Sequence, residues 1–153
     1  MEETKQIIFN IGEEEYGVGI DDVKGIERQM QIVKVPNRPP YILGIVNLRG
    51  DIIPVYSLKV KFGGEETIEE ESKLIITNAS GLTIALKVDE VKEITEVPVE
   101  NIFELPMLAS NEHTDYVKNI AKIDKRIVIL LDVNGVLGEE ERERIAEMLQ
   151  EID

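Results

Sequence analysis

The side chains needed for catalysis or metal binding are scarce in this sequence. Its 153 residues include no cysteine and one histidine, His113, which lies in a polar stretch and is expected at the surface. A zinc site or a nucleophile–base pair therefore lacks its residues. We interpret the neighbouring acids Asp21-Asp22 and Asp89-Glu90 as turn caps rather than as a general acid and base. We expect no catalytic residue, no metal, no cofactor and no enzymatic activity.

One arginine is notable for its position. Residues 45–48 and 52–58 have the composition of two strands, and Arg49, Gly50 and Asp51 separate them. Gly50 supplies the positive φ of a hairpin turn, which places Arg49 at a rigid tip. Such an arginine suits partner recognition, and a solvated turn charge is the equally open alternative. Pro54 cannot donate to a ladder, so we predict an edge or a bulge there.

The charge balance excludes several partners. The formal net charge is −14, from 31 acidic and 17 basic residues. This disfavours nucleic acid, whose binding requires neutralised phosphates, and an anionic membrane surface. No apolar run approaches the roughly 20 residues of a membrane span, and the N-terminus does not resemble a signal peptide. We expect a cytoplasmic protein that does not insert into a membrane.

The chain contains an internal repeat. Residues 5–10 form a strand candidate, residues 16–20 alternate as a second, and residues 31–35 resemble a third. After the glutamate-rich stretch 61–72, residues 73–78 match 5–10, and at the same offset residues 88–94 match 20–26. Residues 82–87 alternate as the strand at 16–20 does. The repeat indicates a duplicated unit of about five short strands.

The repeat predicts two small barrels that pack together, because closure removes exposed strand edges. We assign residues 1–60 to the first barrel, 61–72 to an acidic linker or loop and 73–137 to the second barrel. Whether the terminal strands close their own barrel or exchange between barrels is left open. Residues 138–153 predict a C-terminal helix that docks on the protein's own body through Ile145, Met148, Leu149 and Ile152.

The hairpin Asn47-Leu48-Arg49-Gly50, with Gly44 before it and residues 52–58 after it, resembles the signature of the CheW family of chemotaxis coupling proteins. The resemblance covers nearly the whole chain, including residues 14–17 and residues 130–132 before the terminal helix. It implies an all-β fold with a C-terminal helix, made of two SH3-like five-stranded barrels. It also implies a non-catalytic adaptor that joins the cytoplasmic tips of methyl-accepting chemoreceptors to the CheW-like regulatory domain of the histidine kinase CheA. Such a chain is a monomer alone and forms higher-order arrays with its partners.

The resemblance also implies an interface. In the family the first barrel meets the kinase domain, and the receptor tip lies in the groove between barrels. By position, the sensitive surface includes Val23, Gly44, Asn47, Arg49 and Gly50, and the segment 84–91, with Ile84, Leu86 and Val88, helps to wall the groove. The chain departs from the family at Gly25, where some members carry a glutamate that can pair with an opposite charge, and at Ala85 and Asn119.

Two other interpretations remain. A small-ligand-binding β-barrel protein would need polar groups that converge inside an apolar pocket, whereas the side chains predicted to point inward are aliphatic. The sequence is also compatible with a coupling domain of a longer protein. The short N-terminus and the terminal helix favour a complete single-function chain.

Overall fold

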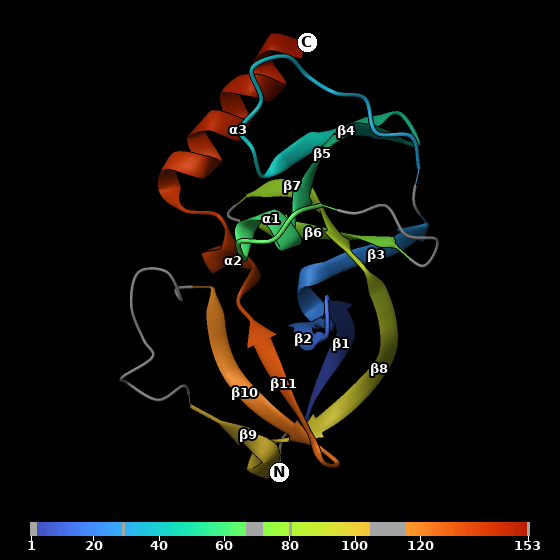
Figure 1. Cartoon of the computed structure of the whole chain (residues 1–153), viewed down its shortest axis with the longest axis vertical. Coiled ribbons are helices and arrows are strands. Elements are labelled where there is room, and N and C mark those ends of the chain that lie inside the picture. The colour runs from blue at the N-terminus through green and yellow to red at the C-terminus, as the bar shows by residue number, and fades with distance from the viewer. Residues whose placement is uncertain (1–2, 29, 67–71, 80, 105–115, 153) are drawn as a thin grey trace.

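The computed structural model describes residues 3–28, 30–66, 72–79, 81–104 and 116–152, which form two mixed β-sheets and a C-terminal helix (Figure 1). Sheet A lies at the end of the molecule that carries the N-terminus. Its order is β8 (Glu90–Pro98), β1 (Glu3–Ile11), β2 (Glu14–Gly19), β11 (Arg126–Leu131), β10 (Val117–Ile123) and β9 (Ile102–Phe103). Sheet B has the order β3 (Val23–Arg28), β6 (Lys73–Ala79), β7 (Leu82–Val88), β5 (Asp51–Ser57) and β4 (Ile42–Leu48).

The predicted all-β fold with a C-terminal helix is confirmed, with six strands in sheet A and five in sheet B. The sixth strand, β9, contains two residues at the edge of sheet A. Each sheet contains one parallel pair, β2 with β11 and β5 with β7. A short helical turn follows each of four strands: η1 (Ile20–Asp22), α1 (Leu58–Lys61), η2 (Val99–Asn101) and α2 (Val133–Val136).

The sheets exchange strands across the stretch 61–72. The hairpin β1–β2 joins sheet A, whose other strands come from residues 90–131, and the hairpin β6–β7 joins sheet B with β3, β4 and β5. The sheets therefore coincide with neither residues 1–60 nor residues 73–137. Each strand of sheet B has an equivalent in sheet A: β6 corresponds to β1, β7 to β2, β3 to β8, β4 to β10 and β5 to β11. With these equivalents, the first five strands of sheet A follow the same order as the five strands of sheet B.

Three clusters of buried side chains explain why the repeated strands read as continuous apolar runs. In β1, Ile7 and Phe9 face a large core shared by both sheets, whereas Ile8 faces a small core inside sheet A. In β6, Ile75 faces the shared core, whereas Leu74 and Ile76 face a small core inside sheet B. A strand that is buried on both faces needs apolar residues at successive positions.

The helix α3 (Glu139–Ile152) packs on the shared core, as predicted. Ile145 is fully buried and Met148 is nearly so. Glu139, Glu140 and Glu141 lie in the first turn, where carboxylates stabilise the positive end of the helix dipole. Figure 1 shows α3 at the end of the molecule that holds β4 and β5, away from the N-terminus.

Two local predictions were wrong. Residues 31–35 form no strand, and only Val33 pairs, through an isolated bridge to Ile45. The strand β5 is an inner strand and not an edge, because it lies between β7 and β4. Pro54 is tolerated because the ladder to β7 begins only at Val55. The irregular register of the β4–β5 ladder lies elsewhere, between Ile42 and Gly44.

Candidate functional site

The candidate site is built on the β4–β5 hairpin. Leu48 and Asp51 pair across it, so the turn consists of Arg49 and Gly50. Both have positive φ, 50° and 93°, as a type I′ turn requires. The side chain of Asn47 fixes the turn, because its Oδ1 accepts a hydrogen bond from the Gly50 amide at 2.9 Å. The backbone thus holds Arg49 at a defined place on the surface.

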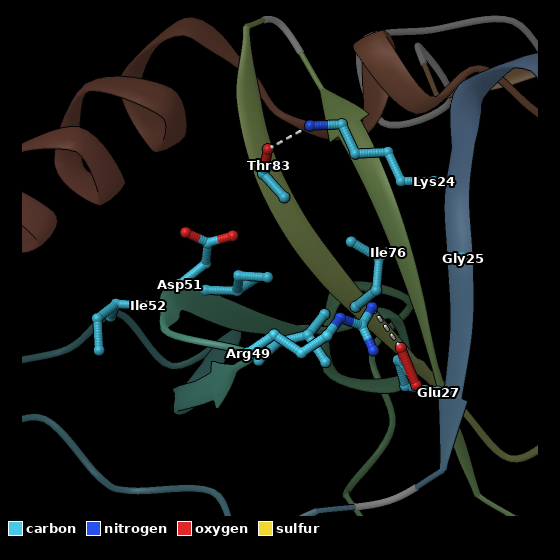
Figure 2. Close-up of a pocket in the computed structure, with 10 residues that line it drawn as sticks. Lys24, Gly25, Glu27, Arg49, Asp51, Ile52, Ile76 and Thr83 are labelled. Carbon is cyan, nitrogen blue, oxygen red and sulfur yellow. Dashed lines mark hydrogen bonds and ion pairs between the residues drawn. The ribbon is translucent and has the colours of Figure 1, made fainter.

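Arg49 lies at the edge of an open pocket of about 450 Å³ (Figure 2). One wall is the hairpin, the opposite wall is β3, and β6 and β7 supply the side chains between them. We call this pocket the Arg49 groove. Its lining residues are Lys24, Gly25, Glu27, Leu48, Arg49, Asp51, Ile52, Ile53, Ile76 and Thr83.

The Arg49 side chain reaches across the groove to Glu27 on β3, as Figure 2 shows. Arg49 Nη2 lies 3.0 Å from Glu27 Oε1. The Arg49 side chain is nevertheless 76% exposed, and exposed ion pairs contribute about 0–1 kcal/mol to folding. Most of its donors therefore face outward and are accessible to a partner's carboxylate or carbonyl groups.

Glu27 is a site residue that the sequence reasoning did not single out. Gly25 lacks the carboxylate that some family members carry at its position, and Glu27, the next residue on the same face of β3, pairs with Arg49. Gly25 pairs with Ile76 and Glu27 with Leu74 across the ladder to β6, so both point toward the small core of sheet B. The alternation counted from Ile26, which faces the shared core, is the sequence signal that could have placed Glu27 on this face.

Lys24 is a second residue that the sequence analysis missed. The register of β3 against β6 shifts between Val23 and Gly25, so Lys24 is the extra residue of a bulge. Its Nζ donates a hydrogen bond to Thr83 Oγ1 at 2.9 Å, at the opposite end of the groove from Glu27 (Figure 2). No local sequence pattern marks this bulge.

The other predicted site residues lie away from the hairpin tip, some of them on β3 and β4 and the rest on β7. Val23 is half-buried at the start of β3 and packs on the shared core, and Gly44 is buried inside β4. Ile84, Leu86 and Val88 of β7 belong to the shared core, with exposed fractions of 0%, 0% and 1%. The structure therefore gathers Asn47, Arg49 and Gly50 at the hairpin tip, whereas Ile84, Leu86 and Val88 offer no surface in the free chain.

Sheet A also carries an arginine, next to its equivalent turn and in a different environment. Arg126 follows the β10–β11 turn and contacts two carboxylates, Glu15 Oε1 at 2.6 Å and Glu93 Oε2 at 3.2 Å. Its side chain is 30% exposed. Two carboxylates hold Arg126 in place within the molecule, whereas one carboxylate holds the far more exposed Arg49. By register, Asp124 and not Arg126 occupies the turn position that Arg49 occupies in the β4–β5 hairpin. Arg49 is the more exposed of the two arginines, and it is the one suited to an external partner.

The edge strands of both sheets also carry partly exposed apolar side chains. Val23 and Ile26 on β3 and Val91 on β8 are half-buried against the shared core. Ile94, opposite the core residue Ile7 in the β1–β8 ladder, is 51% exposed. We call these four residues the apolar strip. Such side chains suit the apolar face of a helix better than they suit a polar ligand.

The described residues form no cluster of titratable groups that could hold a metal ion. His113 lies outside the described residues. Burial raises the pKa of Tyr16, Tyr41, Tyr56 and Tyr116, so all four phenols stay protonated at neutral pH. Within the described residues, no helix is long and apolar enough to cross a membrane.

Comparison with known proteins assigns a family to this architecture. The family model described as a CheW-like domain matches residues 5–141. The chemotaxis protein CheW of Klebsiella aerogenes is 32% identical over 136 residues, which cover 88% of this chain and 82% of that protein. The chemotaxis protein CheW of Bacillus subtilis is 30% identical over 137 residues, which cover 89% of this chain and 88% of that protein.

A solved structure also resembles this chain. The crystal structure of the scaffolding protein TtCheW from Thermoanaerobacter tengcongensis superimposes with a TM-score of 0.83 at 33% sequence identity. The match covers 92% of this chain and 96% of that one. The likeness therefore extends over both sheets and not over one unit alone.

Proposed function

The chain belongs to the CheW family of chemotaxis proteins, and we propose that it is the adaptor that couples chemoreceptors to the histidine kinase CheA. Family membership supports the prediction that the chain is a scaffold rather than an enzyme. In this proposal the chain works in the cytoplasm and is recruited to membrane-associated receptor arrays. Its partners are the CheW-like regulatory domain of the kinase and the cytoplasmic tips of methyl-accepting chemoreceptors.

The observation that carries the proposal is the placement of Arg49. It is an exposed arginine on a rigid two-residue turn, at the edge of an open groove, in a chain of net charge −14. Arginine is enriched among the few residues that dominate a protein–protein interface. A fixed turn also lowers the entropy lost on binding. We assign the Arg49 groove to the kinase regulatory domain.

We assign the apolar strip to the receptor tip. Half-buried aliphatic side chains on two edge strands give shallow contacts that fit the apolar face of a helical hairpin. Ile84, Leu86 and Val88 support this surface from the core rather than touching the receptor. The two assignments use different faces of the β3 strand, so one chain is able to hold both partners at once.

The test is a binding titration of the wild type and Arg49→Ala against the kinase regulatory domain and, separately, a receptor tip fragment. We expect Arg49→Ala to weaken kinase-domain binding by about 30-fold, the loss typical of a hot-spot arginine. Receptor binding and the unfolding midpoint are expected to stay near wild type, because the Arg49–Glu27 ion pair is exposed.

Lys125→Ala is the matched control, because it removes one exposed cation from the equivalent turn of sheet A. It is expected to change kinase-domain binding little. Equal losses in both variants would indicate a general charge effect and remove Arg49 from the interface. A folded wild type that binds neither cognate partner would overturn the adaptor proposal itself.

A further inference from the structure

A second cleft lies beside sheet B and shares no lining residue with the Arg49 groove. Its volume is about 480 Å³, within the range of small-molecule sites. Met30, Ile32 and Leu43 form its apolar wall and pack on the small core of sheet B. Lys34, Arg38, Lys87 and Glu66 also line the cleft. We call this the Lys87 cleft.

The apolar wall of the cleft is held by the backbone. Val33 and Ile45 exchange two backbone hydrogen bonds, at 2.8 and 2.9 Å, which fix the segment after β3 against β4. Gly44 permits this approach, since a Cβ there would lie 2.3 Å from the Val33 carbonyl oxygen and 2.8 Å from Ile32 Cγ2. The wall is therefore formed before any ligand arrives, which lowers the entropy lost on binding.

The charges of the cleft oppose those of the whole chain. Among the described residues, three cationic side chains, Lys34, Arg38 and Lys87, line the cleft with one carboxylate, Glu66, although the chain carries net charge −14. The Lys87 side chain is only 2% exposed and pairs with Glu66, whose carboxylate also accepts a hydrogen bond from Ser57 Oγ. The chain thus already seats one of its own carboxylates at the inner cation, and Lys34 and Arg38 lie at the same cleft.

We propose that the Lys87 cleft binds a small amphipathic organic anion, a monocarboxylate with an aliphatic body. The body contacts Met30, Ile32 and Leu43, and the carboxylate pairs with Lys34 and Arg38. Apolar walls with a few placed polar groups are typical of small-molecule sites, and the excess of cations selects an anion. This site is separate from the adaptor surfaces, and the proposal does not depend on either assigned partner.

The experiment is a titration of the full chain, labelled at the methionine methyl groups and observed by NMR, with octanoate below its micelle concentration. Met30 lines the cleft, whereas Met148 lies in the shared core and reports on the overall fold. Met30→Leu assigns the Met30 signal. We expect octanoate to shift the Met30 signal in a saturable way and to leave the Met148 signal unmoved. We expect neutral octanamide to bind about fivefold more weakly than octanoate.

Charge variants then test where the carboxylate sits. Lys34→Gln with Arg38→Gln is expected to reduce octanoate affinity by about tenfold and to leave octanamide affinity unchanged. Lys125→Gln, an exposed cation on the distant turn of sheet A, is the control and is expected to change neither. The proposal fails if Met30 does not shift, if octanamide binds as well as octanoate, or if Lys125→Gln weakens octanoate as much as the double variant does.

Discussion

Gly44 and Gly50 belong to the same hairpin and have different physical roles. Both have positive φ, 152° and 93°, which favours glycine. A Cβ at Gly44 would lie 2.3 Å from the Val33 carbonyl oxygen, whereas a Cβ at Gly50 would meet no atom within 4 Å. Gly44 therefore maintains the packing of the segment after β3 on β4, and Gly50 maintains the turn that presents Arg49.

Gly44→Ala is expected to lower the free energy of unfolding by about 3 kcal/mol, from a steric clash added to backbone strain. Gly50→Ala, which adds strain alone, is expected to lower it by about 1 kcal/mol. Urea unfolding followed by circular dichroism measures both. If the two variants lose equal stability, the close contact with Val33 does not constrain position 44.

At the scale of elements, the first turn of α3 is tied to sheet B by polar contacts. The Tyr56 hydroxyl on β5 is fully buried and donates a hydrogen bond to Glu141 Oε1 at 3.1 Å. Lys61 Nζ at the end of α1 lies 3.3 Å from both carboxylate oxygens of Glu141. These contacts and the burial of Ile145 place α3 on the shared core.

Burial, followed by the charge and the hydrogen bond of Glu141, raises the pKa of Tyr56 above its ordinary value of 10.0. The unfolded chain therefore loses this proton at a lower pH than the folded chain does. The stability that Tyr56 contributes is fully present below pH 10 and falls as pH rises above it. Burial also raises the pKa of Tyr16, Tyr41 and Tyr116, so the stability that these residues contribute likewise falls as pH rises above 10.

Tyr56→Phe is expected to cost about 1 kcal/mol of unfolding free energy near pH 7, through the lost hydrogen bond to Glu141. The gap from wild type is expected to narrow toward about pH 11, because the variant has no phenol to titrate. Urea unfolding of the wild type and the variant at the two pH values measures the difference in their unfolding free energies.

Tyr41→Phe is the control, because the buried Tyr41 hydroxyl has no hydrogen-bond partner among the described residues. It is expected to lose little stability near pH 7. A loss as large as that of Tyr56→Phe would show that the bond to Glu141 is not what stabilises this end of α3.

Element identity was largely predictable from the sequence, and side-chain orientation was not. Alternation and turn residues located β1, β2, β4, β5 and α3 correctly. Ile84, Leu86 and Val88 were assigned to a groove wall by the family resemblance, whereas the structure buries all three in the shared core. The bulge at Lys24 depends on the register against β6, a contact between distant segments that no local pattern encodes.

At the scale of the whole molecule, the repeat predicted two similar units, and the pairing of strands between them could not be predicted. The pairs β1–β8 and β3–β6 join segments from opposite sides of the stretch 61–72. Intrinsic strand propensity does not distinguish them from pairings within one unit, because equivalent strands carry similar apolar runs. Each sheet is consequently incomplete without the other half of the chain.

This exchange predicts that neither half folds alone. A fragment of residues 1–66 lacks β6 and β7, the central strands of sheet B, and a fragment of residues 72–153 lacks β1 and β2 of sheet A. We expect each fragment alone to show little strand signal by circular dichroism, because β3 and β8 lose their ladder partners. An equimolar mixture is expected to recover the wild-type spectrum and to elute as one complex. If either fragment alone gave a cooperative unfolding transition, its half of the chain would be an independent unit, and the shared core would not be needed to hold the sheets together.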